Sequence, residues 1–298
     1  MKKNQIILFL FVCQLQIGFA SDSLLILKRK KISLISTATA FSTGSIIYLN
    51  QAWYQAYSGS KFHFFNDNNE WFLLDKFGHA FSTYQSARLM MSAMKWAGYS
   101  EKKQMLIGGF SGFTYLTAIE VMDGYSSGWG FSWGDMAANF FGSGLAIGQQ
   151  IVWKEQRIQL KFAYRQSGLA KYNPALLGKN STEQILKDYN GQTYWLSVNP
   201  SSFIKVKNCF PKWLNIALGY GANGMLNATY NKFLVIDANG NAVNFKRYRQ
   251  FYFSLDADLT KIKTKSKVLK SIFTCLNSFK IPFPNVEYSE NKFKFNLY

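Results

Sequence analysis

The placement of ionisable residues along a long apolar stretch, between residues 75 and 142, constrains this chain more than any other feature. Three motifs carry those residues at the ends of apolar segments: Asp75-Lys76-x-x-His79, Glu120-x-x-Asp123-Gly124 and Ser132-x-x-Asp135-x-x-x-Asn139-x-x-Gly142. Burying such groups is costly unless they meet partners. We therefore expect the three motifs to meet one another in the folded chain.

The apolar segments predict three helices, at about 70–96, 101–122 and 132–153. Asn68 or Asn69 is the expected N-cap of the first helix. Small residues recur at a spacing that lets helix backbones approach closely, as Gly108-x-x-x-Gly112 and Gly144-x-x-x-Gly148. Because short loops make neighbouring helices antiparallel, residues 75, 123 and 135 are expected at one end of a bundle.

Residues three or four positions apart share a helix face, so the polar side chains can converge at that end. The candidate catalytic residues are His79, Glu120 and Asp75, with Glu120 or Asp75 as general base and Asp75 orienting His79. The other members of the polar network are Lys76, Asp123, Asp135 and Asn139. No cofactor is indicated, although a divalent cation is compatible with Asp75, His79, Glu120, Asp123 and Asp135 as ligands.

A purely structural interpretation of the same residues stands beside the catalytic one. Asp135 is the third helical position after Ser132, where it completes a capping box. His79 paired with Asp75 is then a satisfied core histidine, and Lys76 pairs with one of the carboxylates. The sequence has two histidines and no Ser-His-Asp order, Cys-His pair, phosphate-binding glycine loop or zinc spacing, which excludes histidine-rich metal chemistry.

The N-terminus predicts export. Lys2 and Lys3 precede an apolar run from Ile6 to Phe19 and a small-x-small site ending at Ala20, the pattern of a signal peptide over residues 1–20. An uncleaved anchor is the alternative. Export excludes nucleic acid as a partner of this basic chain and leaves anionic lipid or another envelope protein.

Cysteines are sparse and provide no disulfide framework. Cys13 follows a lipobox-like leucine, but Val12 is bulky for the position before a lipidated cysteine, so lipidation is disfavoured. Cys209 and Cys275 either form one disulfide or remain as two buried thiols, of which the second is favoured.

Residues 21–60 predict a basic patch followed by an anchor helix. The patch is Lys28 to Lys31, and the apolar part of the next stretch, about 32–57, is long enough to span or lie in a bilayer. Trp53, Tyr54 and Tyr57 resemble an interfacial aromatic belt. A buried bundle helix is the alternative.

Residues 156–298 predict a basic, β-rich region. The net charge of +18 divides into +4 for residues 1–153, with 12 Lys/Arg against 8 Asp/Glu, and +14 for residues 154–298, with 22 against 8. Alternating residues predict strands near 158–165, 214–220, 251–259 and 293–297, in an antiparallel sheet or partial barrel. Ser181-x-x-Gln184 predicts a short helix that ends near Gly191.

A basic amphipathic helix is predicted between the last strands. Its lysines are Lys261, Lys263, Lys265, Lys267 and Lys270, followed by apolar residues at three- and four-residue spacing. These lysines are the candidate contacts with a membrane surface or another anion. A helix packed on the sheet, with its lysines in water, is the alternative.

The motifs between residues 60 and 155 resemble a known family. With Phe62-His63-Phe64-Phe65-Asn66-Asp67 and Glu70-Trp71, they resemble the bacterial envelope domain of unknown function typified by the YfiM lipoprotein, in its larger Bacteroidetes-type version. The Asp-Lys-x-x-His, Glu and Asp-x-x-x-Asn-x-x-Gly pattern is also similar, more loosely, to VanZ-like membrane proteins. The resemblance implies an envelope location and membrane association, and brings no established reaction or ligand.

These observations predict an α+β fold, with about four apolar helices in an N-terminal bundle, then a basic antiparallel β-rich half with an amphipathic helix. The expected segments are a signal peptide (1–20), a basic patch and anchor (21–60), a helical core (61–155) and the basic region (156–298). The leading hypothesis is a non-enzymatic envelope protein that contacts membrane lipid or an envelope protein, with the outer membrane favoured over the inner. The alternative is an enzyme acting on a lipid-linked or cell-wall precursor. A small outer-membrane barrel would need about eight strands, more than the pattern predicts.

Overall fold

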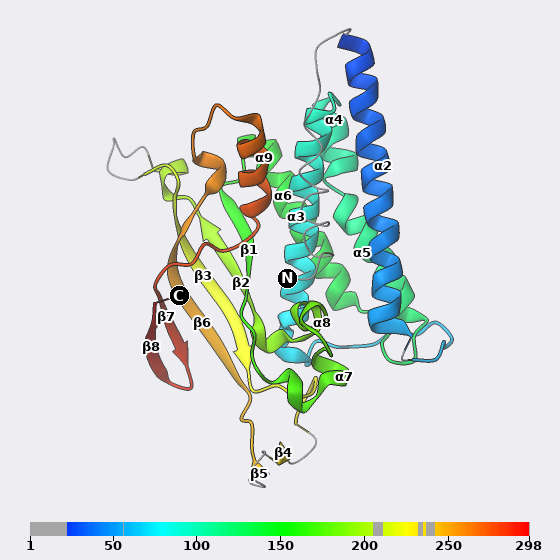
Figure 1. The fold of residues 1–298 in the computed structure, drawn as a ribbon, viewed down its shortest axis with the longest axis vertical. Coiled ribbons are helices and arrows are strands. Elements are labelled where there is room, and N and C mark those ends of the chain that lie inside the picture. The colour runs from blue at the N-terminus through cyan, green and yellow to red at the C-terminus, as the bar shows by residue number, and fades with distance from the viewer. Residues whose placement is uncertain (1–22, 56, 205–210, 232–234, 237–241, 298) are drawn as a thin grey trace.

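A layer of helices and a curved antiparallel sheet make up the computed structural model, which describes residues 23–297 except 56, 205–210, 232–234 and 237–241 (Figure 1). The expected signal peptide, Cys13 and Cys209 lie outside the described residues. The main helices are α2 (Ser23–Leu49), α3 (Leu74–Trp96), α4 (Glu101–Lys103), α5 (Ser111–Gly124), α6 (Trp133–Trp153), α7 (Pro174–Leu177), α8 (Ser181–Lys187) and α9 (Lys267–Leu276). The strands are β1 (Ile158–Tyr164), β2 (Gln192–Val198), β3 (Leu214–Asn223), β4 (Val235–Ile236), β5 (Ala242–Val243), β6 (Tyr248–Ala257), β7 (Asn285–Ser289) and β8 (Lys292–Asn296). The expected α+β class, with helices first and an antiparallel sheet after them, is confirmed.

The helix α3 begins later than the sequence predicts. The residues Trp71–Leu73 all have positive φ and form a 3-10 turn, so the α-helix starts at Leu74 rather than near Glu70. Non-glycine residues avoid this conformation unless packing holds them there. Leu74 is fully buried, and the hydroxyl of Tyr220 donates to the backbone oxygen of Phe72, so the sheet fixes the turn.

The second predicted helix is divided, and the small residues pack differently along the bundle. A π-helical segment, Gln104–Gly108, separates α4 from α5. Gly108 and Gly112 both lie against the backbone of α3, as their spacing predicts. The prediction for Gly144 and Gly148 is wrong, because no atom of the described residues lies within 4 Å of a Cβ at either position. Gly142 makes the close approach on α6, since a Cβ there would lie 2.1 Å from a backbone oxygen of α3.

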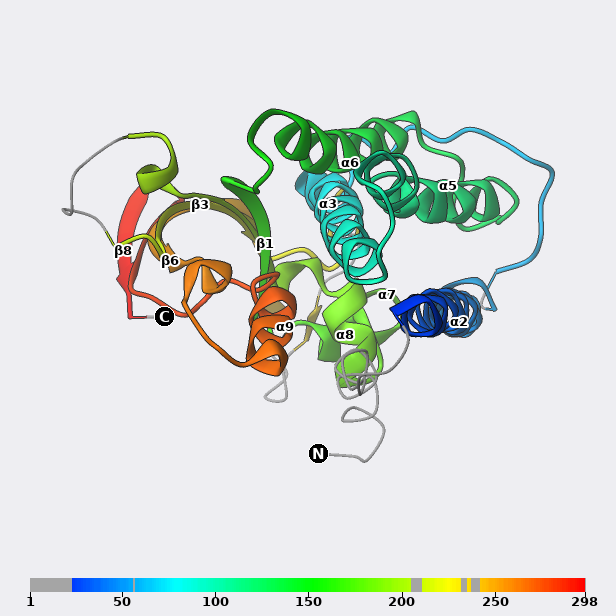
Figure 2. The ribbon, with the colours of Figure 1, turned by 90° about the horizontal axis from the view of Figure 1, so that it is seen from above.

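Helix α2 stands beside the bundle with little of its surface covered (Figures 1 and 2). It starts at Ser23, so the basic patch Lys28–Lys31 lies within the helix and not before it. Two helical stretches of the described chain, Leu24–Tyr54 and Glu101–Gly124, are long and apolar enough to cross a membrane by length and composition. The ammonium of Lys187 on α8 meets the backbone oxygen of Ala52 in Asn50–Tyr54, the π-helical segment that follows α2, and this contact joins that segment to the sheet half.

Six strands form one open antiparallel sheet in the order β1-β2-β3-β6-β7-β8. The strands that alternation predicts are present as β1, β3, β6 and β8, whereas β2 and β7 were not predicted. The sheet curves around α9, which lies on its concave side (Figure 2). Asn180, and not Ser181, caps α8 by accepting from the amides of Thr182 and Glu183.

The concave face of the sheet buries a charged group that we call the sheet cluster, made of Gln159, Lys161, Asp256, Asp258 and Asn277. Lys161 and Asp256 are fully buried and lie 2.7 Å apart, Nζ to Oδ2. Lys161 also donates to Asn277 Oδ1 at 3.2 Å, and Gln159 Nε2 donates to Asp258 Oδ2 at 2.8 Å. Buried charges are tolerated where they are paired and hydrogen-bonded in this way.

Candidate functional site

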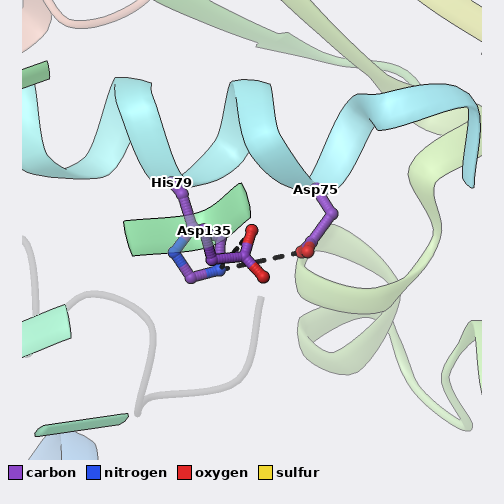
Figure 3. Close-up of side chains that lie close together, drawn as sticks. All are labelled: Asp75, His79 and Asp135. Carbon is purple, nitrogen blue, oxygen red and sulfur yellow. Dashed lines mark ion pairs between the residues drawn. The ribbon is translucent and has the colours of Figure 1, made fainter. Parts of the chain in front are cut away.

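The polar motifs of the three helices converge at the end of the bundle that faces α8. Figure 3 shows Asp75, His79 and Asp135 with their side chains directed toward one another. Glu120 joins them from the end of α5. We call the group the helix-end cluster, made of Asp67, Asp75, Lys76, His79, Glu120, Asp135 and Asn139.

The imidazole of His79 is the centre of the cluster. Its Nδ1 lies 3.0 Å from Asn139 Oδ1. Its Nε2 lies 3.8 Å from Asp75 Oδ1, 3.7 Å from Glu120 Oε1 and 3.7 Å from Asp135 Oδ1. Because an amide oxygen only accepts, Nδ1 donates to Asn139, which leaves the Nε2 of a neutral ring with its lone pair toward three carboxylates. That arrangement suits a cation between the groups, and the orienting role expected of Asp75 belongs to Asn139.

Lys76 pairs with three carboxylates and not with one. Its Nζ lies 2.6 Å from Asp67 Oδ1, 2.8 Å from Asp135 Oδ1 and 3.3 Å from Asp75 Oδ2. Burial opposes its charge, but the charges of Asp75 and Asp135 outweigh burial and raise the pKa of Lys76. Lys76 therefore supplies the positive charge that offsets part of the carboxylate charge in the cluster.

Ser132 begins α6 as a cap, as the motif predicts, but its partners differ. Its Oγ accepts from the amide of Asp135 at 3.1 Å, and its own amide donates to Glu120 Oε2 at 3.1 Å. Its hydroxyl donates to Asp67 Oδ1 at 2.6 Å. In a capping box the acidic side chain three residues on takes the cap amide. Glu120 fills that role here, so the carboxylate of Asp135 is left to face Lys76 and His79.

Two tyrosines hold the outer carboxylates, and the sequence did not assign them to the site. The hydroxyl of Tyr189 donates to Asp75 Oδ1 at 2.6 Å, and that of Tyr54 donates to Asp123 Oδ1 at 2.6 Å. Tyr54 was expected in an interfacial belt, and Tyr189 lies in the β-rich half without any motif around it. The bond to Tyr54 turns one oxygen of Asp123 toward the π-helical segment after α2, so Asp123 borders the cluster.

Burial and mutual repulsion separate the pKa values of the carboxyls. Burial, then the charge of Asp75, raises the pKa of Asp135 to about 9. Burial raises the pKa of Glu120 to about 8 and that of Asp123 to about 6. Burial also opposes ionisation of Asp75, yet His79 and the neighbouring ammonium outweigh it and lower its pKa. The cluster thus combines an ionised carboxylate with protonated carboxyls, a pattern typical of acid–base and binding sites.

A cavity of about 500 Å³ opens beside the cluster, between α2, α3, α5 and α8. Asp67, Asp75, His79, Glu120 and Asp135 line one part of it. Apolar and aromatic side chains line the rest, among them Trp53, Tyr57, Phe81, Leu116, Leu176 and Ile185. The indole nitrogen of Trp129, also in the wall, is buried and has no hydrogen-bond acceptor within the described chain. Such a cavity suits a ligand with a polar head and an apolar body.

Three members of the cluster have the geometry of cation ligands. One ligand atom each from Asp75, His79 and Asp135 lie within 4.8 Å of one another. Ligands about 2.0–2.6 Å from one ion stand roughly 3–4 Å apart, close to the separations around His79 Nε2. Glu120 Oε1, 3.7 Å from that nitrogen, is a fourth candidate.

The lysines of the predicted amphipathic helix lie far along the chain from the cluster and have separate contacts. Lys261 pairs with Glu155 at 2.6 Å and is partly buried. The exposed lysines are Lys263, Lys265, Lys267 and Lys270, of which the last two lie on α9. The helix itself is confirmed, with Ser266 as its cap.

Comparison with known proteins gives a family for the helical part. Residues 63–149 match the family described as a predicted periplasmic lipoprotein (DUF2279). The match includes α3, α4, α5 and most of α6, and with them the whole helix-end cluster. It supports an exported cell-envelope domain of unknown function. No curated protein and no solved structure matches the chain.

Proposed function

We propose that this chain is a membrane-associated envelope protein whose helix-end cluster binds a divalent cation and whose cavity holds an amphiphilic envelope molecule. A lipid-linked or cell-wall precursor is the substrate class that such a cavity suits. The observation that carries the proposal is His79, whose Nε2 faces three carboxylate oxygens at 3.7–3.8 Å. The YfiM-like and VanZ-like resemblance of the motifs supports the envelope location and membrane association in this proposal.

The excess of carboxyls over cations argues for a binding role. Five carboxyls lie at this end of the bundle, from Asp67, Asp75, Glu120, Asp123 and Asp135, against the ammonium of Lys76 and the ring of His79. A cation between the carboxylates would remove their repulsion and would also allow an anionic head group to approach.

Acid–base chemistry on the bound molecule is the enzymatic form of the proposal. Glu120 has a pKa of about 8, which is near the value that suits proton transfer at neutral pH. Its Oε1 lies on the cavity side near His79, while Oε2 is held by the amide of Ser132. Glu120 is therefore positioned to accept or return a proton at a bound ligand, and His79 to polarise it.

A second candidate function is contact with anionic lipid or an envelope protein through the basic half, without turnover. The exposed lysines near α9, Lys263, Lys265, Lys267 and Lys270, favour it. In that case the helix-end cluster is a structural network in which Lys76 is the permanent cation.

Titration of the full chain with Mn²⁺ tests the proposal, with binding followed by electron paramagnetic resonance and calorimetry. We expect saturable binding that His79→Gln abolishes. Asn139→Leu, which removes the acceptor for Nδ1, should weaken binding about 10–100-fold, as loss of outer partners of metal ligands does. Glu101→Gln, which removes an exposed carboxyl outside the cluster, is the control and should leave Mn²⁺ affinity unchanged. Absence of binding at millimolar Mn²⁺ with the fold intact would overturn the proposal in favour of the structural network.

A further inference from the structure

The six-stranded sheet buries polar side chains on its concave face, the reverse of the usual arrangement. On the concave face the side chains of Lys161, Ser197, Asn215 and Asp256 are fully buried. An antiparallel sheet with one face in water normally shows the opposite arrangement, with apolar side chains inside and polar ones outside. The other face of this sheet must therefore carry the apolar side chains.

Two rows of directly opposed apolar or aromatic residues cross all six strands on the convex face. The aliphatic-rich row is Leu160, Leu196, Leu218, Phe253, Val286 and Phe295. The aromatic row is Phe162, Tyr194, Tyr220, Phe251, Tyr288 and Phe293. Neither row contains a charged residue, although the chain has a net charge of +18.

The helical layer covers the aromatic row from β1 to β3. Phe81 of α3 packs on Phe162 and Tyr194, with ring centroids 5.6 and 6.0 Å apart, and Phe77 of α3 packs on Tyr220 at 4.8 Å. Farther along the rows the exposed fraction rises, to 52% for Phe253 and 69% for Phe295. The apolar surface thus runs from the core of the protein to the open edge at β8, and contiguous apolar surface of this kind marks an interaction site.

We propose that the convex face of the sheet lies against the acyl chains of a membrane with anionic head groups. Charge complementarity supports this occupant, because the rows are uncharged whereas cations stand at the strand ends. Lys212 precedes β3, and Arg249 lies near the other end of the face. Such cations are attracted to anionic lipid head groups while apolar side chains insert beneath them.

The curvature of the sheet argues against a second copy as the occupant. Figure 2 shows the sheet bending around α9, so the apolar face is the convex one. Two rigid convex faces touch over a narrow strip, too little for the area that a stable interface buries. Fluid acyl chains conform to a convex surface. This surface is separate from the helix-end cluster, and the inference does not depend on the proposed function.

Quenching by brominated lipid tests the inference in the full chain. The native cysteines are replaced by serine, and an environment-sensitive fluorophore is attached at Phe253→Cys, at Leu218→Cys or at the control Thr182→Cys, an exposed position on α8. The protein is reconstituted in vesicles of phosphatidylcholine and phosphatidylglycerol with or without brominated acyl chains. We expect a blue shift and a several-fold greater loss of emission at positions 253 and 218 than at 182, with the circular dichroism of all variants unchanged.

A charge variant gives an independent readout. Because Phe253 is already half exposed, Phe253→Lys should keep the fold and lower vesicle binding in high salt several-fold, relative to Thr182→Lys. Equal quenching at all three positions would overturn the inference. Quenching confined to the control, or close 253–253 contacts between two copies in place of lipid contact, would overturn it as well.

Discussion

The helix-end cluster and the sheet cluster both bury charged side chains, but they differ in charge balance and in access. In the sheet cluster, Lys161 and Asp256 neutralise each other at 2.7 Å and both are fully buried, while the second buried carboxyl, Asp258, accepts hydrogen bonds from Gln159 and Thr260. In the helix-end cluster several carboxyls share Lys76, and the group borders a cavity of about 500 Å³. The difference teaches that burial of charge alone does not mark a binding site. A group of charges that is unbalanced and borders a cavity does mark a binding site, because a ligand that supplies the missing charge stabilises it.

The largest effect on stability is expected at the Lys161–Asp256 pair, where the charges balance. Lys161→Met leaves Asp256 buried without its partner, and we expect the free energy of unfolding to fall by about 3–5 kcal/mol. Denaturant unfolding of the full chain in detergent measures it. Adding Asp256→Leu removes the orphaned charge and should restore most of the loss. A loss below about 1 kcal/mol would show that the sheet cluster is as adaptable as the helix-end cluster and would break the comparison.

The sequence predicts the helix-end cluster well because its members lie at helix ends, where periodicity fixes their faces. Asp75 and His79 share one turn of α3, and short loops bring Glu120 and Asp135 to the same end. Tyr189 could not be predicted as a partner of Asp75, since 114 residues separate them and only tertiary packing joins them. The capping role of Glu120 was missed for the same reason.

The sheet illustrates a different limit of sequence reasoning. Alternation predicts that Gln159 and Lys161 face one way, and Ile158 and Leu160 the other. It does not say which face is buried, and the usual assumption would place Lys161 in water. Asp256 and Asn277 are the partners of Lys161 in the interior, and both lie about one hundred residues farther along the chain. The strand β2 was missed because Tyr194, Trp195 and Leu196 interrupt its alternation, and β7 was missed because, at five residues, it is short.

An intermediate effect is expected from the pH dependence of the unbalanced cluster. The folded-state pKa of Asp135 is about 9, above its ordinary value of 3.8, so between these limits the folded chain binds more protons than the unfolded chain. The free energy of unfolding should therefore fall as pH rises through that window, by up to roughly 1.4 kcal/mol per pH unit for one proton. Asp135→Asn should flatten this slope, measured by unfolding in metal-free buffer between pH 6 and pH 9.

The matched control for Asp135→Asn is Glu101→Gln, an exposed acidic residue that reports the contribution of surface charge to the slope. A slope of opposite sign, with stability rising toward pH 9, would mean that Asp135 is ionised and fully balanced by Lys76. The helix-end cluster would then be a charge-balanced structural network, as the Lys161–Asp256 pair is.

The smallest effect is expected from charges that are not buried at all. Lys267 is exposed at the start of α9, so its ammonium stays hydrated. Its attraction to a partner is therefore weakened by the surrounding water. Lys267→Gln should weaken binding to vesicles containing phosphatidylglycerol by about 1 kcal/mol, the contribution of one cation near an anionic surface. Because exposed charges are screened, the difference should vanish in high salt, whereas the loss caused by Phe253→Lys should persist there. Lys171→Gln, an exposed lysine in the turn before α7, is the control. If Lys267→Gln weakened vesicle binding equally at low and high salt, Lys267 would make a specific contact and not a diffuse attraction. It would then differ in kind from both buried clusters.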